Sequence, residues 1–148
     1  MKLISHRGNY NGINPDRENK PSYIDTAISM GYEVEVDIRF IDGEFYLGHD
    51  TPDTLISKNW IEKRKENIWF HCKNLESAKE LSKMCDIKYF CHTNDDYVLT
   101  STKHIWVHNL GLPIDEICII PLLDEESIKK YINVEVYAIC TDYLNLFK

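Results

Sequence analysis

The chain has 148 residues, enough for one domain with one hydrophobic core and too few for two ordinary domains. It carries 24 acidic against 17 basic residues, a formal net charge of -7, and its basic residues are scattered along the sequence. A nucleic-acid partner is not expected, because a polyanion requires a concentrated basic surface. An acidic protein that handles a phosphate must bring positive charge to its site, from a metal ion or from a few His, Arg and Lys side chains.

The start of the chain lacks the apolar stretch of a secretory signal, and no window approaches the ~18 apolar residues of a membrane span. The five cysteines are an odd set without a close C-x-x-C pair, which favours reduced thiols over a disulfide frame or a zinc ribbon. We interpret them as buried packing residues. These features predict a cytoplasmic protein without a membrane span.

The first elements alternate between strand and helix signals. A short apolar strand ends at His6, and a polar loop follows. Residues 21–30 predict a helix, because apolar side chains recur on one helical face between an early proline and a closing glycine. Residues 33–41 alternate between apolar and ionic side chains, which predicts a strand with one face of each kind. The Asp-Gly dipeptide at 42–43 predicts a tight turn, and residues 44–47 return as the second arm of a hairpin.

Short β-rich runs and helical patterns continue to the end of the chain. Further strands are expected at 68–72, 88–92, 105–107, 117–122 and 136–140, with 97–100 as a candidate that leaves open a total of seven or eight. Helices are expected at 59–65, 75–85 and 124–132. Strand alternating with helix predicts a mostly parallel sheet covered by helices, although the interval 91–121 barely has room for one. The sequence therefore predicts an α/β fold, a shortened (β/α) TIM-type barrel with several helices trimmed in its second half, formed by residues 1–148 as a single domain.

Most of the histidines lie at or just past the ends of predicted strands, namely His6, His49, His71, His92 and His108, whereas His104 does not. In parallel α/β sheets and barrels the carboxyl ends of the strands hold the active site. The pattern predicts that these imidazoles share one rim. Because strand boundaries are uncertain by ~2–4 residues, a structural role is the favoured interpretation for His92, His104 and His108.

Glu35 and Asp37 stand two apart on one predicted strand, so both point to the same side, with carboxylates ~6–7 Å apart. Like charges on an enclosed face repel unless a cation lies between them, and a divalent, oxygen-preferring metal is the natural partner. The alternative is a solvated face of an open antiparallel sheet. We favour an ionic face inside a barrel mouth, because the neighbouring Val34, Val36 and Ile38 require a helix layer on their own side.

The first fifty residues resemble the opening of the glycerophosphodiester phosphodiesterase family, within the phospholipase C-like phosphodiesterase barrels. The motifs that carry the resemblance, in order and spacing, are His6-Arg7-Gly8, Glu18-Asn19, Glu35-x-Asp37, Asp42-Gly43 and His49-Asp50. The related sphingomyelinase D toxins share the two histidines and the Glu-x-Asp pair. Thr141-Asp142 is similar to the ending of the family's last strand. The middle of the chain, from residue 51 to 136, matches only loosely and is shorter than usual.

The resemblance implies metal-dependent phosphodiester cleavage by two-histidine acid/base catalysis. His6 and His49 would flank the phosphodiester as general base and general acid, since imidazole can act as either near neutral pH. Arg7 and Lys73 would bind phosphate oxygens. In this family the substrate's own neighbouring hydroxyl can attack first and give a cyclic phosphate. Whether this chain hydrolyses that cyclic product is left open by the sequence.

The resemblance also implies a divalent metal ion, Mg²⁺, Mn²⁺ or Ca²⁺, held by Glu35 and Asp37 and neutralising the charge of the transition state. One departure concerns the third metal-binding carboxylate, which the family carries in a Glu-x-Lys motif. This chain has His71-Cys72-Lys73 there. His71 could ligate the metal through nitrogen, another group could complete the shell, the site could be weakened, or His71 could merely be packed. We expect His71 to be the third ligand.

Three functions stay open from the residues. The leading one is an enzyme of lipid metabolism that acts on a small-molecule or lipid-derived phosphodiester. A binding or scaffold protein on a catalytically impaired barrel is the rival, motivated by the lost carboxylate and the short chain. A cupin-like or other histidine-rich metal oxidoreductase would leave Arg7 and Lys73 without a role, because these residues favour an anion. We favour the enzyme, because six charged or titratable groups on one rim lower stability and a scaffold has no evident use for such groups.

A trimmed barrel also leaves apolar strand faces without helical cover. The faces around Ile105, Val107, Ile117 and Ile119 are the ones expected to lack it. Exposed patches of that size usually mark an interface. The sequence therefore predicts a homodimer or higher homo-oligomer.

Overall fold

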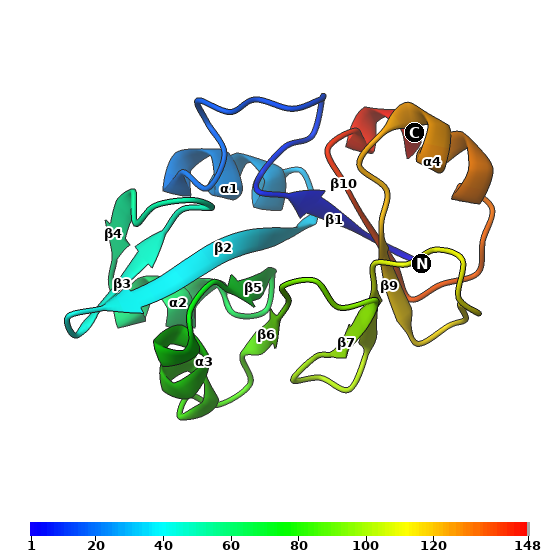
Figure 1. Ribbon diagram of the computed structural model, residues 1–148. Coiled ribbons are helices and arrows are strands. Elements are labelled where there is room, and N and C mark those ends of the chain that lie inside the picture. Colours follow the sequence, from blue (N-terminus) through cyan, green and yellow to red (C-terminus); the bar gives the residue numbers. More distant parts are fainter. Residues whose placement is uncertain (148) are drawn as a thin grey trace.

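The computed structural model describes residues 1–147, and its strands form one 10-stranded sheet (Figure 1). The strands are β1 (Lys2–His6), β2 (Glu33–Ile41), β3 (Glu44–Leu47), β4 (Thr54–Ile56), β5 (Ile68–Cys72), β6 (Lys88–Cys91), β7 (Tyr97–Leu99), β8 (Ile105–Val107), β9 (Cys118–Pro121) and β10 (Ala138–Thr141). The helices are α1 (Pro21–Ser29), α2 (Lys58–Arg64), α3 (Leu75–Ser82) and α4 (Glu125–Tyr131), followed by a 3-10 turn at Leu144–Phe147.

Parallel pairing joins the strands in the order β8-β9-β10-β1-β2-β5-β6. Antiparallel strands extend this set, with β3 and β4 beyond the carboxyl half of β2 and β7 beside β8. The candidate strand at 97–100 is therefore real, but it is an antiparallel edge strand and not a further member of the parallel set. Among the described residues β6 pairs only with β5, so the sheet is curled and its ladder does not close into a full barrel.

Local chemistry explains several boundaries. Pro21 occupies the first turn of α1, where its missing N–H is not needed. The Asn74 and Asp124 side chains cap α3 and α4 by accepting from the main-chain N–H three residues on. Asp42 and Gly43 have φ of 50° and 83°, the left-handed pair that a two-residue hairpin turn requires. None of the helices in the described part of the chain is long and apolar enough to cross a membrane.

The apolar residues divide between an outer layer and the interior of the curl. The outward faces of β2 and β5 pack under α1, α2 and α3 through residues such as Val36, Phe70 and Leu81. The interior is filled by the cluster Ile4, Trp69, Phe90, Trp106, Ile119, Ala138 and Cys140. A third cluster lies beneath α4. As predicted, the described chain has no helix between β6 and β9.

The sequence-based expectation of uncovered strand faces is largely wrong. Val107 is buried in the cluster beneath α4, and Ile119 is buried inside the curl. Ile117 is exposed, but it lies just before β9 and outside its strand face. A single chain thus covers most of the surface on which the expected homo-oligomer depended, and the structure gives that expectation no support.

The prediction that all five cysteines are packing residues is right for three of them and wrong for two. Cys72, Cys118 and Cys140 are buried, whereas Cys85 and Cys91 are exposed. Cys85 follows α3, which ends at Ser82 and so leaves the last residues of the expected helix outside it.

Candidate active site

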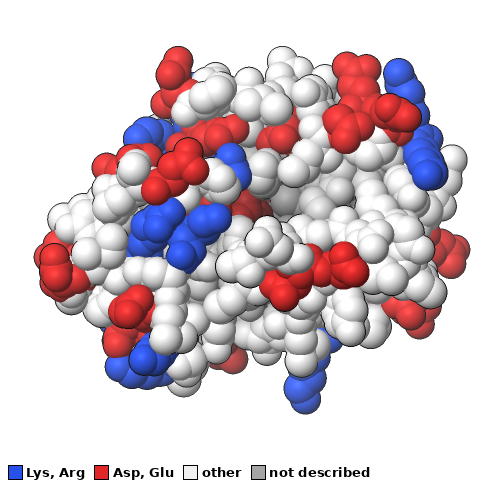
Figure 2. Space-filling model, viewed as in Figure 1, with Lys and Arg blue, Asp and Glu red and all other residues white. Residues whose placement is uncertain are grey.

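A pocket of about 700 Å³ opens at the carboxyl ends of the parallel strands, and Figure 2 shows this hollow with acidic atoms inside it and basic side chains along its left margin. The histidines that line it are His6, His49, His71, His92 and His108. As predicted from the strand ends, these imidazoles share one rim. His104 lies elsewhere and stacks on Tyr137, with 3.7 Å between ring centroids.

The turn after β1 holds its residues in an unusual backbone conformation. Arg7 has φ 55° and Gly8 has φ 92°. A left-handed conformation is costly for a residue with a long side chain and is found where the surroundings enforce it, frequently at functional sites. Here the Arg7 N–H donates to the Glu35 carbonyl at 2.8 Å. A Cβ on Gly8 would lie 2.9 Å from the Tyr23 ring, so this position requires glycine.

His6 is held by the far end of the chain. Its Nδ1 lies 2.8 Å from Asp142 Oδ1, and its Nε2 lies 3.9 Å from Glu35 Oε2. A carboxylate only accepts, so Nδ1 carries the proton and the lone pair of a neutral ring is on Nε2. Burial opposes a charge on His6, but the hydrogen bond to Asp142 and the charge of Glu35 raise its pKa. This ring is oriented to accept a proton at Nε2.

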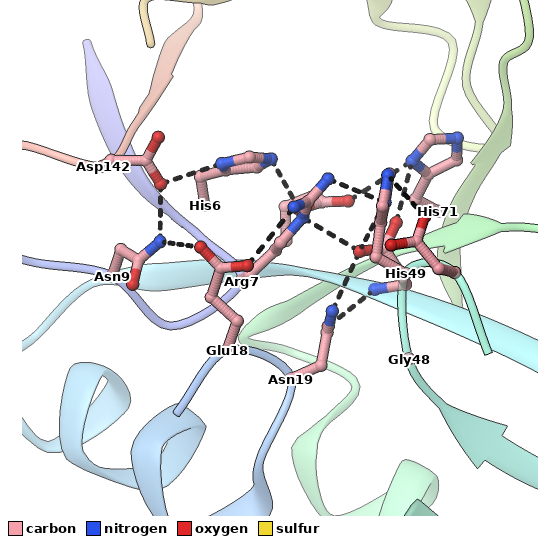
Figure 3. Close-up of polar contacts among 12 residues, drawn as sticks. His6, Arg7, Asn9, Glu18, Asn19, Gly48, His49, His71 and Asp142 are labelled. Carbon is pink, nitrogen blue, oxygen red and sulfur yellow. Dashed lines mark hydrogen bonds and ion pairs between the residues drawn. The ribbon is translucent and has the colours of Figure 1, made fainter. Parts of the chain in front are cut away.

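Asp142 also connects the site to the loop after β1. Asn9 Nδ2 donates to Asp142 Oδ1 at 2.7 Å and to Glu18 Oε1 at 2.8 Å (Figure 3). Glu18 in turn pairs with Arg7 Nη1 at 3.3 Å. Asn9 and Asp142 are both buried, and sequence reasoning did not assign them to the site. The Thr141-Asp142 ending was the one available signal.

His49 follows β3 and meets Arg7. Its Nδ1 lies 2.7 Å from Arg7 Nη2 and 3.4 Å from Asp37 Oδ2. Because a guanidinium can only donate, the shorter contact makes Nδ1 the acceptor, and the proton of a neutral ring is then on Nε2. In their neutral forms His6 therefore presents a lone pair at Nε2, whereas His49 presents an N–H there. His49 can act as a proton donor only as the imidazolium, which then leaves a neutral ring.

Glu35, Asp37 and His71 form a group that could hold a metal ion. One ligand atom from each residue lies within 4.8 Å of the others. Glu35 and Asp37 are buried, and Glu35 Oε2 and Asp37 Oδ1 have no hydrogen-bond partner. Buried carboxylate oxygens are normally satisfied, because an unpaired one is costly. A divalent cation would satisfy both, so the donors present fit such an ion.

His71 is the register partner of Asp37 on the neighbouring strand. Its Nδ1 lies 3.3 Å from Asp37 Oδ1 and 3.5 Å from Glu35 Oε1, while its ring stacks on Phe90. Burial works against its charge, yet the contacts with Asp37 and Glu35 raise the pKa of His71 to about 9. Burial likewise opposes the Asp37 charge, but His71 and Arg7 hold the Asp37 pKa below its usual range. Without an ion, the His71 imidazolium provides the positive charge between the carboxylates.

The remaining predicted site residue, Lys73, lines the same pocket. His92 and His108 also line it, and their rings stack with 3.3 Å between centroids. Burial and the neighbouring imidazoles lower the pKa of His108 to about 4, and burial also lowers the pKa of His92. These two rings are neutral at neutral pH and add no positive charge to the pocket.

Fold and site together define a class of protein, a curled parallel α/β sheet whose carboxyl rim combines paired imidazoles and cationic side chains with a carboxylate pair. Comparison with solved structures finds the same fold in glycerophosphodiester phosphodiesterases. The enzyme from Agrobacterium tumefaciens str. C58 aligns with a TM-score of 0.61 at 16% identity, over 99% of this chain and 98% of its own. A putative enzyme of this kind from Galdieria sulphuraria aligns with a TM-score of 0.52 at 14% identity, over 97% of this chain and 94% of its own.

No protein-family model matches the sequence, and no curated protein matches it either. The structural neighbours are nonetheless of the family that the sequence motifs resemble. At these identities the likeness establishes the fold and confirms the resemblance at that level.

Proposed function

We propose that the protein is a metal-dependent phosphodiesterase that cleaves a glycerophosphodiester or a related lipid- or glycan-linked phosphodiester. The observation that carries the proposal is that His6 and His49 line one pocket, each presenting Nε2, beside buried carboxylate oxygens that lack a hydrogen bond. The shared fold of two glycerophosphodiester phosphodiesterases supports it.

In the proposed reaction His6 is the general base and His49 the general acid. Nε2 of His6 takes the proton of the substrate hydroxyl next to the ester, and that oxygen attacks phosphorus. The bond from phosphorus to the leaving oxygen breaks, and His49 acts in its imidazolium form, with Nδ1–H turned from Arg7 to Asp37 Oδ2. Its Nε2 donates a proton to the departing alcohol and leaves a neutral ring. The product is a cyclic phosphate, and its later opening by water would return the protons in the opposite sense.

Arg7 and Lys73 are the proposed phosphate-binding residues. The guanidinium has five N–H groups, and its contacts with Asp37, Glu18 and His49 engage only part of them. The others are free for nonbridging oxygens of the substrate. Glu35, Asp37 and His71 are the proposed ligands of Mg²⁺, Mn²⁺ or Ca²⁺, which when bound neutralises charge on the phosphoryl oxygens.

The decisive experiment is an activity assay on chelated protein, with Mg²⁺, Mn²⁺ or Ca²⁺ added back. The substrates are glycerophosphocholine, glycerophosphoethanolamine and lysophosphatidylcholine, and ³¹P NMR distinguishes a cyclic phosphate from a monoester. We expect turnover of at least one substrate only after an ion is restored. Absence of turnover with every ion and substrate would contradict the proposal.

A second candidate is a phosphate-ligand-binding or scaffold protein, favoured by the His71 imidazolium that already balances the two carboxylates. In that case sn-glycerol 3-phosphate would bind without added metal, and no substrate would turn over. Calorimetry with this ligand, with and without Mg²⁺, separates the two functions. The cytoplasmic location remains a prediction from the sequence.

A further inference from the structure

Arg39 continues the ionic face of β2 beyond Glu35 and Asp37, and none of the proposed roles uses it. Its Nη2 donates to the His49 carbonyl at 2.5 Å, and its Nε donates to the Gly48 carbonyl at 3.4 Å. From these contacts we infer that Arg39 is a positioning residue for His49, fixing the turn that carries the imidazole. The inference deepens the proposed function and rests on it for the role of His49.

The turn after β3 needs such support because two of its main-chain carbonyls are not paired within the sheet. β3 ends at Leu47, and the carbonyls of Gly48 and His49 lie outside the ladder. Among the described residues, both carbonyls accept a hydrogen bond from Arg39. Without it these two acceptors would depend on water alone, and the turn would gain freedom to move.

The turn is also tight, so its support fixes a defined geometry. A Cβ on Gly48 would lie only 1.9 Å from the Thr51 carbonyl oxygen, and the Gly48 N–H donates to the Asp37 carbonyl at 3.1 Å. The His49 side chain beyond it is 39% exposed, and Arg7 holds the ring at Nδ1. Arg7 therefore fixes the ring and Arg39 fixes the main chain that carries it.

Arg39 does not line the pocket, so its effect must pass through His49. The planar guanidinium offers two donors to two neighbouring carbonyls at once, which an ammonium on a flexible stem does less well. A catalytic group displaced by about 1 Å can lose ~10²-fold in rate. Loss of Arg39 should therefore lower turnover and leave ground-state binding of the phosphate largely unchanged.

The test is a double-mutant cycle of Arg39→Ala and His49→Ala under saturating metal. We expect Arg39→Ala to lower kcat by ~10–100-fold with KM within about twofold, and Arg39→Lys to recover part of the loss. In the His49→Ala background the same change should have no further effect on kcat. Full additivity, or a wild-type kcat in Arg39→Ala, would overturn the inference.

Arg64→Ala is the matched control. Arg64 also combines an ion pair, here with Asp25 at 2.7 Å, with a main-chain contact to the Trp60 carbonyl at 3.4 Å, and it lies outside the pocket. This variant should keep the wild-type kcat. If Arg39→Ala does not fold, Arg39→Gln and Arg39→Lys take its place in the cycle.

A measurement without substrate separates this inference from the proposed function. In protein labelled with ¹⁵N-histidine, the ring resonances of His49 should shift in Arg39→Ala and stay unchanged in Arg64→Ala, with His6 as internal reference. A shift in a protein that turns over no phosphodiester would leave the positioning role standing and remove the proposed function. An unshifted His49 ring would overturn the positioning role.

Discussion

Glu33 and Glu35 stand two apart on the same face of β2, yet their carboxylates differ in hydrogen bonding at the two ends of the curled sheet. At the amino end Glu33 is saturated: Oε1 accepts from Lys2 at 2.5 Å, and Oε2 accepts from Lys88 at 2.8 Å and from Trp69 at 2.6 Å. At the carboxyl rim Glu35 Oε2 is buried and has no hydrogen-bond partner. Glu33 is satisfied within the chain, as a carboxylate that stabilises the fold should be, and the open oxygen of Glu35 agrees with its proposed role as a metal ligand.

The histidines repeat the comparison. His104 at the amino end stacks on Tyr137, and its Nδ1 shares a hydrogen bond with the Thr102 hydroxyl. Its partners thus lie close by within the chain. His6 and His49 at the rim each use Nδ1 in a hydrogen bond and leave Nε2 without one. The difference between the two ends can be tested by making the same substitution at both.

The largest effect is expected from removing either rim imidazole. His6→Ala and His49→Ala should each lower kcat by ~10²–10⁴-fold with the fold intact, because each removes a proton-transfer group. Wild-type kcat should follow a bell-shaped pH profile, and each variant should lose one limb of it. His104→Ala, measured in the same assay, should keep its kcat. Near-normal turnover of either rim variant under saturating metal would reject these roles.

The next effect contrasts the two glutamates. Glu35→Gln should weaken Mn²⁺ or Mg²⁺ binding at least ~10-fold, since it removes a charged ligand oxygen, and it should not destabilise the protein greatly. Glu33→Gln should leave ion affinity unchanged and lower the free energy of unfolding by about 1 to 3 kcal/mol, because charged hydrogen bonds are lost. Calorimetric titration and urea unfolding of both variants measure the two quantities. Equal ion affinities in the two variants would contradict the proposed site.

A smaller effect concerns the choice of ion at His71. An imidazole ligand favours Mn²⁺ over Mg²⁺ or Ca²⁺ relative to a carboxylate. His71→Glu, which restores the family pattern, should shift preference toward Mg²⁺ or Ca²⁺, and His71→Ala should weaken Mn²⁺ more than Mg²⁺. An unchanged order of affinities in both variants, measured by calorimetry, would show that His71 is not a ligand.

The pH dependence of ion binding follows from the same residue. An imidazole must lose its proton to bind a metal, and an ordinary histidine would do so near pH 6.5. The two carboxylates raise the pKa of His71 to about 9, so ion affinity should keep rising with pH up to about 9. In His71→Ala this rise should disappear. Titrations at pH 6.5, 7.5 and 8.5 compare the two proteins, and parallel curves would contradict the assignment.

The elements around the rim could be predicted because their signals are local. Strict alternation and an Asp-Gly turn predicted strands at 33–41 and 44–47, and β2 and β3 have these bounds. β4 escaped prediction, since its three residues become a strand only by pairing with β3. The burial of Val107 and Ile119 was not predicted for a related reason. Val107 is covered through the packing of α4, and Ile119 lies inside the curled sheet, and both depend on contacts between distant segments.

The site divides in the same way. Strand ends placed the histidines, and spacing placed Glu35 with Asp37 on one face. The orientation of the rings was not predictable, because it depends on partners far away in sequence, such as Asp142 for His6. The support that Arg39 gives to His49 likewise exists only after the hairpin has closed.

The smallest expected effect is a pH dependence of stability at the amino end of the sheet. Burial opposes the charge of Glu33, but its hydrogen bonds with Lys2 and Lys88 lower its pKa from the ordinary 4.5. A group whose pKa is lower in the folded state stabilises the fold fully above the unfolded value and loses that contribution as pH falls through the folded value. Wild type should thus lose this contribution below about pH 4.5, whereas Glu33→Gln should lack it at every pH. The Tm difference between the two proteins, measured from pH 7 to pH 3, should shrink toward acid, and a constant difference would show that the Glu33 charge does not stabilise the fold.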